Sequence, residues 1–200
     1  MTNMDKGWRG LGRLFLLATA LTPVTILLHE FGHFAVAVQS GRPVQLHLTS
    51  VTGGASVTDP AWLQAAQAGS GPLVTLILTG VGLAELRRGG HLWGLALAGA
   101  AVSRLFTDLA YLCVRLLLFA LGKPFGGTPS FDEFDFARIV KLNDILVSAI
   151  ASSVLMLTIW LMWRWTDRAR RAVRLAEVLL GVGAAYVPMM LFGSVTILSV

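Results

Sequence analysis

Long apolar stretches separated by short polar segments make up most of this chain. Five stretches are each long enough to cross a bilayer as a helix, which takes about 20 mostly apolar residues. They cover residues 11–39, 62–86, 92–121, 145–163 and 178–200. The pattern predicts an all-α integral membrane protein, with residues 1–200 forming a single domain built as a bundle of about five transmembrane helices.

The segment between the first two stretches, residues 41–59, is too polar to span a membrane. Residues 44–49 alternate between apolar and polar, and residues 51–57 are β-prone with Gly53 and Gly54 in their middle. This pattern predicts a short β-hairpin after the first helix, with a plain connecting loop as the alternative. An open strand edge there would be able to hold an extended peptide.

Charged residues interrupt the third apolar stretch, and a polar segment follows it. Arg104 and Asp108 are four residues apart, which predicts an ion pair that faces the bundle, while Arg115 lies further along. A role for these residues in substrate or metal handling is the alternative. Residues 122–130 form a Gly/Pro-rich loop, and residues 131–142 are expected to form a short helix capped by Asp132 or Ser130.

Composition agrees with a membrane protein. Hydrophobic residues make up 55% of the chain and charged residues only 14%, against about 25% charged in soluble domains. The net charge of +5 comes mainly from Lys and Arg beside the apolar stretches, where they set topology and meet anionic lipid, so a nucleic-acid partner is not expected. A single cysteine, Cys113, excludes a disulfide framework.

The distribution of positive charge predicts the orientation. Ten Lys and Arg residues fall before residue 14, at residues 87–88 and within residues 164–174, and four fall in the alternate segments. The positive-inside rule therefore favours a cytoplasmic N-terminus. The basic start resembles a secretory signal, but the apolar run continues to about residue 38, so we expect a retained first span in a prokaryotic plasma membrane.

The most specific pattern in the chain is His29-Glu30-Phe31-Gly32-His33, which reads H-E-x-x-H. Two histidines four residues apart lie on one face of a helix, close enough to hold one Zn²⁺. Glu30 would then orient and deprotonate a water at the metal. The alternative is two core histidines with a buried glutamate paired to an arginine, but three ionisable groups in an apolar helix are costly unless they are used.

A catalytic zinc usually takes three protein ligands, so a third is needed. With the N-terminus inside, the histidines lie in the outer half of the first span, whereas Glu85 lies at the cytoplasmic end of the second. The acidic cluster at residues 132–135 lies on the same side as the histidines. Asp132 and Asp135 are therefore the candidates, and Asp108 is a weaker one because Arg104 can pair with it.

At this point the chain resembles the site-2 protease family of intramembrane zinc metalloproteases. Besides H-E-F-G-H in the first span, G-P-L-V-T at residues 71–75 resembles that family's Gly-Pro-Leu-x-Asn segment. F-D-F-A-R-I-V at residues 134–140 resembles its Leu-Asp-Gly-Gly-Arg-Ile-Leu motif, whose aspartate is the third zinc ligand. The resemblance covers roughly residues 14–145.

The resemblance implies a zinc cofactor, a membrane-protein substrate, and substrate contacts by Gly71, Pro72 and residue 75, in addition to the Gly53-Gly54 strand. Two departures stand out. The asparagine after Gly-Pro is Thr75 here, and the two glycines after the aspartate are Phe136 and Ala137. Asp132 therefore competes with Asp135 as a metal ligand. We expect no PDZ domain, which would make this protein a minimal form.

The leading hypothesis is an intramembrane zinc metalloendopeptidase that hydrolyses peptide bonds in or near transmembrane segments of membrane proteins. The departures at Thr75 and Phe136 motivate an alternative, a catalytically silent zinc-binding membrane protein that binds or regulates partner helices. A third hypothesis is a metal or proton transporter whose pathway includes Arg104, Asp108 and Arg115.

Overall fold

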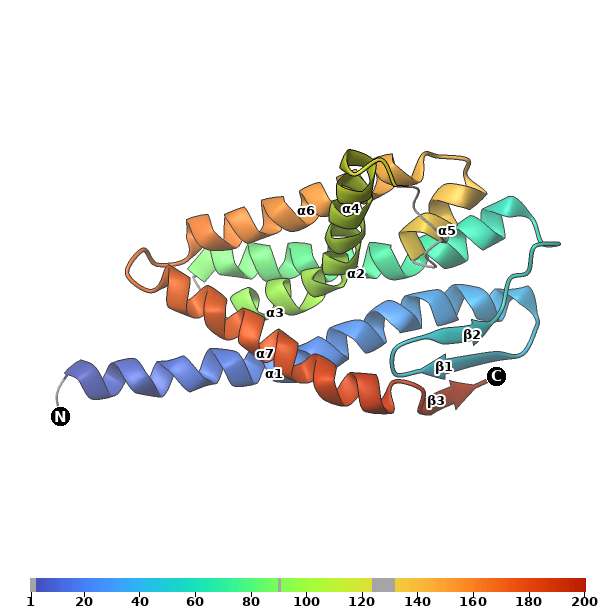
Figure 1. Ribbon diagram of the computed structural model, residues 1–200. Helices are drawn as coiled ribbons and strands as arrows, with labels where there is room; N and C mark the ends of the chain where they lie inside the picture. Colours follow the sequence, from blue (N-terminus) through green and yellow to red (C-terminus); the bar gives the residue numbers. More distant parts are fainter. Residues whose placement is uncertain (1–2, 90, 124–131) are drawn as a thin grey trace.

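The computed structural model describes residues 3–89, 91–123 and 132–200, and it is mostly helical (Figure 1). The long helices are α1 (Asn3–Ala37), α2 (Ala61–Gly89), α6 (Asp144–Trp165) and α7 (Arg171–Phe192), and the shorter ones are α3 (Leu92–Val102), α4 (Phe106–Ala120) and α5 (Asp132–Ile139). Two 3₁₀ turns, η1 (Val38–Ser40) and η2 (Ser103–Leu105), and the strands β1 (Val44–His47), β2 (Val51–Gly53) and β3 (Thr196–Ser199) complete the fold. Four helices are long and apolar enough to cross a membrane, at Gly12–Ser40, Ala61–Gly89, Asp144–Trp165 and Arg171–Met189.

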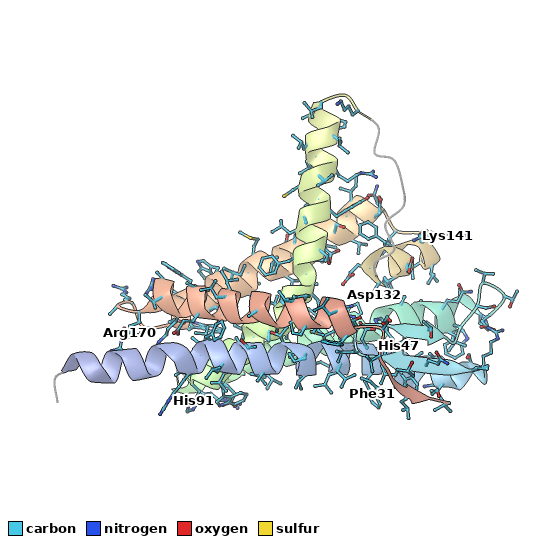
Figure 2. The ribbon with its side chains drawn as sticks, turned by 60° about the horizontal axis from the view of Figure 1, so that its bottom comes forward. Phe31, His47, His91, Asp132, Lys141 and Arg170 are labelled. Atoms are coloured by element: carbon cyan, nitrogen blue, oxygen red, sulfur yellow. The ribbon has the colours of Figure 1, made fainter. Side chains whose placement is uncertain are left out.

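The prediction of a continuous third span over residues 92–121 was wrong. The helix breaks at η2, where the Ser103 hydroxyl donates a hydrogen bond to the Ala100 carbonyl at 2.7 Å, a local bond that competes with regular helix geometry. The 11 residues of α3 reach about 16 Å, too short for a bilayer. Beyond the break α4 leaves at a steep angle and projects from the bundle (Figures 1 and 2).

The predicted fifth span, residues 178–200, was also wrong in its bounds. Helix α7 begins earlier, at Arg171, and ends at Phe192, after which the last residues form β3. A short apolar run is compatible with either a buried helix or a strand, and periodicity alone does not separate the two.

The predicted hairpin after the first helix is confirmed, but the all-α class needs correction because the chain contains a three-stranded sheet. β1 pairs antiparallel with β2, with Val44 opposite Gly53, and antiparallel with β3 on its other side. β1 is thus the central strand and β2 is an edge. Gly53 has a φ of +90°, and a Cβ there would lie 2.2 Å from the Pro43 carbonyl oxygen, so only glycine fits.

Helix α3 lies at the centre of the bundle. Ala96, Ala98 and Ala100 have no exposed surface, and a Cβ at Gly82 of α2 would lie 2.5 Å from the Ala98 nitrogen. Small residues therefore let α2 and α3 pack with their backbones almost in contact. The outer faces of the long helices, by contrast, carry exposed large apolar side chains such as Ile77, which is the distribution a surrounding bilayer requires.

The two chain ends lie at opposite ends of the bundle (Figure 1). The basic C-terminal end of α2 and the turn between α6 and α7 lie at the same end as the start of α1. This arrangement is compatible with the predicted cytoplasmic N-terminus, which stays a prediction. The Gly/Pro-rich loop at residues 122–130 and the Ser130 cap fall largely outside the described residues.

Candidate metal centre

Helix α1 brings the two histidines of the motif together on the face that meets α2. His29 and His33 are one turn apart and buried, and their Nε2 atoms are 3.1 Å from each other. A Cβ at Gly32, between them in sequence, would lie 2.9 Å from the Ser70 carbonyl oxygen, so α1 and α2 are in close contact here. The motif is therefore at a tight helix–helix junction.

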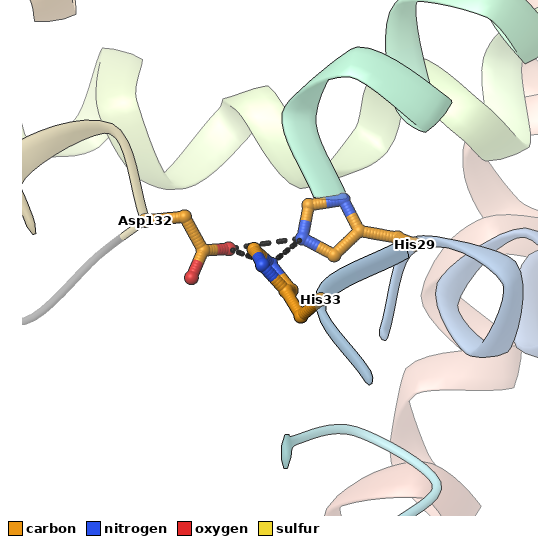
Figure 3. Close-up of side chains that lie close together, drawn as sticks. All are labelled: His29, His33 and Asp132. Atoms are coloured by element: carbon orange, nitrogen blue, oxygen red, sulfur yellow. Dashed lines mark hydrogen bonds and ion pairs between the residues drawn. The ribbon is translucent and has the colours of Figure 1, made fainter. Parts of the chain in front are cut away.

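Asp132, the first residue of α5, completes a triangle with these histidines (Figure 3). Its Oδ2 is 2.9 Å from Nε2 of His29 and 3.1 Å from Nε2 of His33. Asp135 points elsewhere and pairs with Arg138 at 2.6 Å. Between the two aspartates that the sequence left as alternatives, the structure brings Asp132 to the histidines, and together the three residues can hold a metal ion.

The second nitrogen of each imidazole has its own partner. Nδ1 of His33 donates to the backbone carbonyl of Gln67 at 2.6 Å, because a carbonyl oxygen only accepts. Nδ1 of His29 lies 2.8 Å from the hydroxyl oxygen of Thr75. A proton held on Nδ1 leaves the lone pair of Nε2 directed into the triangle, as in metal sites whose outer partners fix the histidine tautomer.

Three electron-pair donors thus converge on one point. Lone pairs this close repel unless a cation lies between them. In a tetrahedral site with ligand bonds of about 2.0–2.1 Å, donor atoms are roughly 3.3 Å apart, close to the observed spacings.

Gly71 of α2 provides the space that such a cation needs. A Cβ at this position would lie 2.1 Å from Nε2 of His33 and 2.6 Å from Nε2 of His29. Pro72 follows inside the helix and has no N–H to donate to the carbonyl of Ala68, one turn earlier. The predicted Gly-Pro pair therefore opens the helix wall beside the histidines, and the donor set, its outer partners and this space all fit a bound metal ion.

Glu30, the predicted base, is buried beside the triangle. Its Oε1 lies 3.1 Å from Nη2 of Arg104, but no hydrogen bond of good geometry reaches this atom from the described residues. The predicted ion pair between Arg104 and Asp108 was wrong: Arg104 contacts Glu30 and Asp132 instead. The break at η2 is the reason, because it removes the regular helical spacing that the prediction assumed.

The other charged candidates lie apart from the three ligand atoms. Both carboxylate oxygens of Asp108 are buried without a hydrogen bond from any residue that the structure describes. Arg115 is 4.0 Å from Asp144, and Glu85 pairs with Arg88 at the other end of α2.

A cavity of about 930 Å³ opens onto the metal centre. Glu30, His33, Arg104 and Asp132 all line it. Its lining also includes Thr49 and Ser50, Val51 at the start of β2, and residues 55–57 beyond the strand. Gly53 and Gly54 do not line the cavity. Their positive φ angles shape the hairpin, and their contact with substrate stays a prediction.

Sequence reasoning missed one contact of this site and predicted the wrong partner for one residue. The carbonyl of Gln67 as the partner of His33 carries no sequence signal, because every residue has a carbonyl. Arg104 did carry a signal, an arginine inside an apolar stretch, but its partners depended on a helix break that periodicity does not reveal.

No protein-family model, no curated protein and no solved structure matches this chain.

Proposed function

We propose that this protein is a zinc-dependent endopeptidase of the membrane, acting on peptide bonds in or near transmembrane segments of other membrane proteins. The observation that carries the proposal is the convergence of His29, His33 and Asp132 beside the buried carboxylate of Glu30 at one cavity. Two imidazoles and one carboxylate, with a fourth position open to solvent, is the ligand set typical of hydrolytic zinc sites. The resemblance to site-2 proteases noted above supports the same reaction.

The residues of the chain have distinct tasks in this reaction. Zinc held by the three ligands would polarise the scissile carbonyl and acidify a water molecule. Glu30 accepts a proton from the attacking water as the new carbon–oxygen bond forms, and returns it to the amine nitrogen as the carbon–nitrogen bond breaks. Thr75 and the Gln67 carbonyl keep the imidazole rings oriented through their Nδ1 atoms.

The sheet supports a substrate role for the hairpin. A transmembrane helix satisfies all of its backbone hydrogen bonds internally, so a substrate must unwind before it can be cleaved. β2 is the edge strand, and the residues that lead into it line the same cavity as Glu30. An unwound segment paired along that edge would regain hydrogen bonds while its backbone passes the metal centre.

Replacing Glu30 with Gln tests the assignment, because glutamine has nearly the same shape but does not accept the proton. In zinc-loaded protein in nanodiscs, Glu30→Gln should abolish cleavage of single-span membrane peptides and leave about one zinc per chain. Cleavage that persists in this variant would sink the proposal. A wild-type chain that holds zinc and cleaves none of a broad panel would instead favour the silent zinc-binding protein.

A further inference from the structure

The roles proposed so far, three metal ligands and Glu30 as the base, leave Arg104 without a function. It lies in η2, the 3₁₀ turn at which the buried α3 ends and α4 departs from the bundle. The turn puts a charged side chain at the depth of the metal centre, and 26% of that side chain is exposed toward the cavity. An arginine in such an apolar setting is costly unless its charge is used.

One nitrogen of this side chain reaches three of the four groups of the site, all except His33. Nη2 of Arg104 is 3.0 Å from Nε2 of His29, 3.1 Å from Oε1 of Glu30 and 3.4 Å from Oδ2 of Asp132. If His29 gives its lone pair to a metal, it no longer accepts from Arg104. The N–H of Arg104 that points at Nε2 of His29 is then free to donate to an oxygen atom held beside the three candidate ligand atoms.

Several other donors near the site are less well placed. The Thr75 hydroxyl lies where the family pattern has asparagine, but it is buried and does not line the cavity. The side-chain amides of Gln64 and Gln67 donate to backbone carbonyls, and Arg138 pairs with Asp135. Of the described side chains lining the cavity, Arg104 is the donor that combines a full positive charge with contact to the ligand atoms.

We infer that Arg104 is a catalytic residue of the proposed hydrolysis: its Nη2–H donates to the oxygen of the scissile carbonyl and stabilises the negative charge that develops there. The inference rests on the proposed function. Guanidinium stays protonated in proteins, so the positive charge is permanent, and its planar fork holds the N–H in a fixed direction. A donor that is already in place lowers the barrier because it stabilises the negative charge that forms on the oxygen as the carbonyl carbon becomes tetrahedral.

The test compares Arg104→Gln and Arg104→Lys with the wild type, all zinc-loaded in nanodiscs. Arg115→Gln is the matched control, because Arg115 has a similar side-chain exposure of 30%, pairs with Asp144 and does not line the cavity. Four quantities are measured: zinc per chain, kcat and KM on a cleaved membrane peptide, and affinity for a phosphinate tripeptide. The phosphinate carries a charged tetrahedral group that mimics the developing oxyanion.

We expect Arg104→Gln to keep its zinc, to lose about 100- to 1,000-fold in kcat with little change in KM, and to bind the phosphinate about 100-fold more weakly. Arg104→Lys should recover part of both losses, and Arg115→Gln should match the wild type. Loss of zinc in parallel, a loss confined to KM, or unchanged phosphinate affinity would each overturn the inference. If wild-type protein cleaves nothing, the proposed function fails, and the phosphinate measurement still decides whether Arg104 is the anion-binding donor.

Discussion

Gly71 and His33 are in such close contact that an added Cβ at position 71 would lie 2.1 Å from Nε2 of His33, one of the three candidate ligand atoms. The two residues come from different helices, α2 and α1, and both helices continue past this point. The space for a metal ion is therefore created by the absence of a side chain on one helix facing the ligands of the other.

Gly71→Ala should consequently lose at least about 100-fold in zinc affinity, more than the change of an outer hydrogen-bond partner costs. Gly80→Ala is the control, since Gly80 lies in the same helix and an added Cβ there meets nothing within 4 Å. Both substitutions gain about 0.5–1 kcal/mol of helix propensity, so that term cancels in the comparison. Zinc titration of the two purified variants decides the matter, and equal affinities would contradict the proposed position of the ion.

Asp132 and Asp135 are three residues apart in α5, but only Asp132 reaches the histidines. Asp132→Asn should reduce zinc affinity by at least about 100-fold, because a neutral amide replaces an anionic ligand. Asp135→Asn removes the charge that pairs with Arg138 and should leave zinc affinity unchanged, because Asp135 is not one of the three candidate ligands. Metal analysis after dialysis against a weak chelator separates the two, and the reverse order of affinities would transfer the ligand role to Asp135.

Thr75 and Thr79 provide a second matched pair, one turn apart on α2 and both buried. The Thr75 hydroxyl contacts His29 Nδ1, whereas the Thr79 hydroxyl has no hydrogen-bond partner among the described residues. Thr75→Val should weaken zinc binding by about 10- to 100-fold, as loss of an outer partner does at other metal sites. Thr79→Val should bind zinc like the wild type. Similar zinc affinities for the two variants would show that the threonine contact does not orient the ring.

One part of the site was predictable from sequence because it depends on local spacing: the i,i+4 histidines had to share a helix face. Gly71 and Pro72 were expected to contact substrate, and the position of Gly71 against the two histidines was not predicted. The choice between Asp132 and Asp135 was not predictable. It depends on how α5 lies against α2, and contacts between elements distant in sequence leave no period in the chain.

The fold, like the site, was predictable only where local sequence patterns determine the structure. Long apolar stretches gave the four long helices and period-two alternation gave the hairpin, whereas the break at residues 103–105 and the strand at residues 196–199 were missed. Both misses lie in apolar runs whose hydropathy stays high. There the local conformation is decided by partners, which are the surrounding helices for α3 and the edge of β1 for β3.

The loop between β2 and α2 should respond to pH through Asp59. The backbone N–H of Ser56 and the side chain of Arg42 both donate to this carboxylate, and they hold the pKa of Asp59 below its ordinary value. Because the pKa is lowered in the folded loop, the ionised carboxylate stabilises the loop at pH values above the ordinary pKa of the group. This contribution is lost as the pH falls through the pKa of the folded loop. Hydrogen exchange at Ser56, corrected for its intrinsic rate, should therefore be slower in wild type than in Asp59→Asn at pH 7. The two should converge as the pH falls below the folded pKa of Asp59, and a difference that persists in stronger acid would show that the carboxylate charge is not what holds the loop.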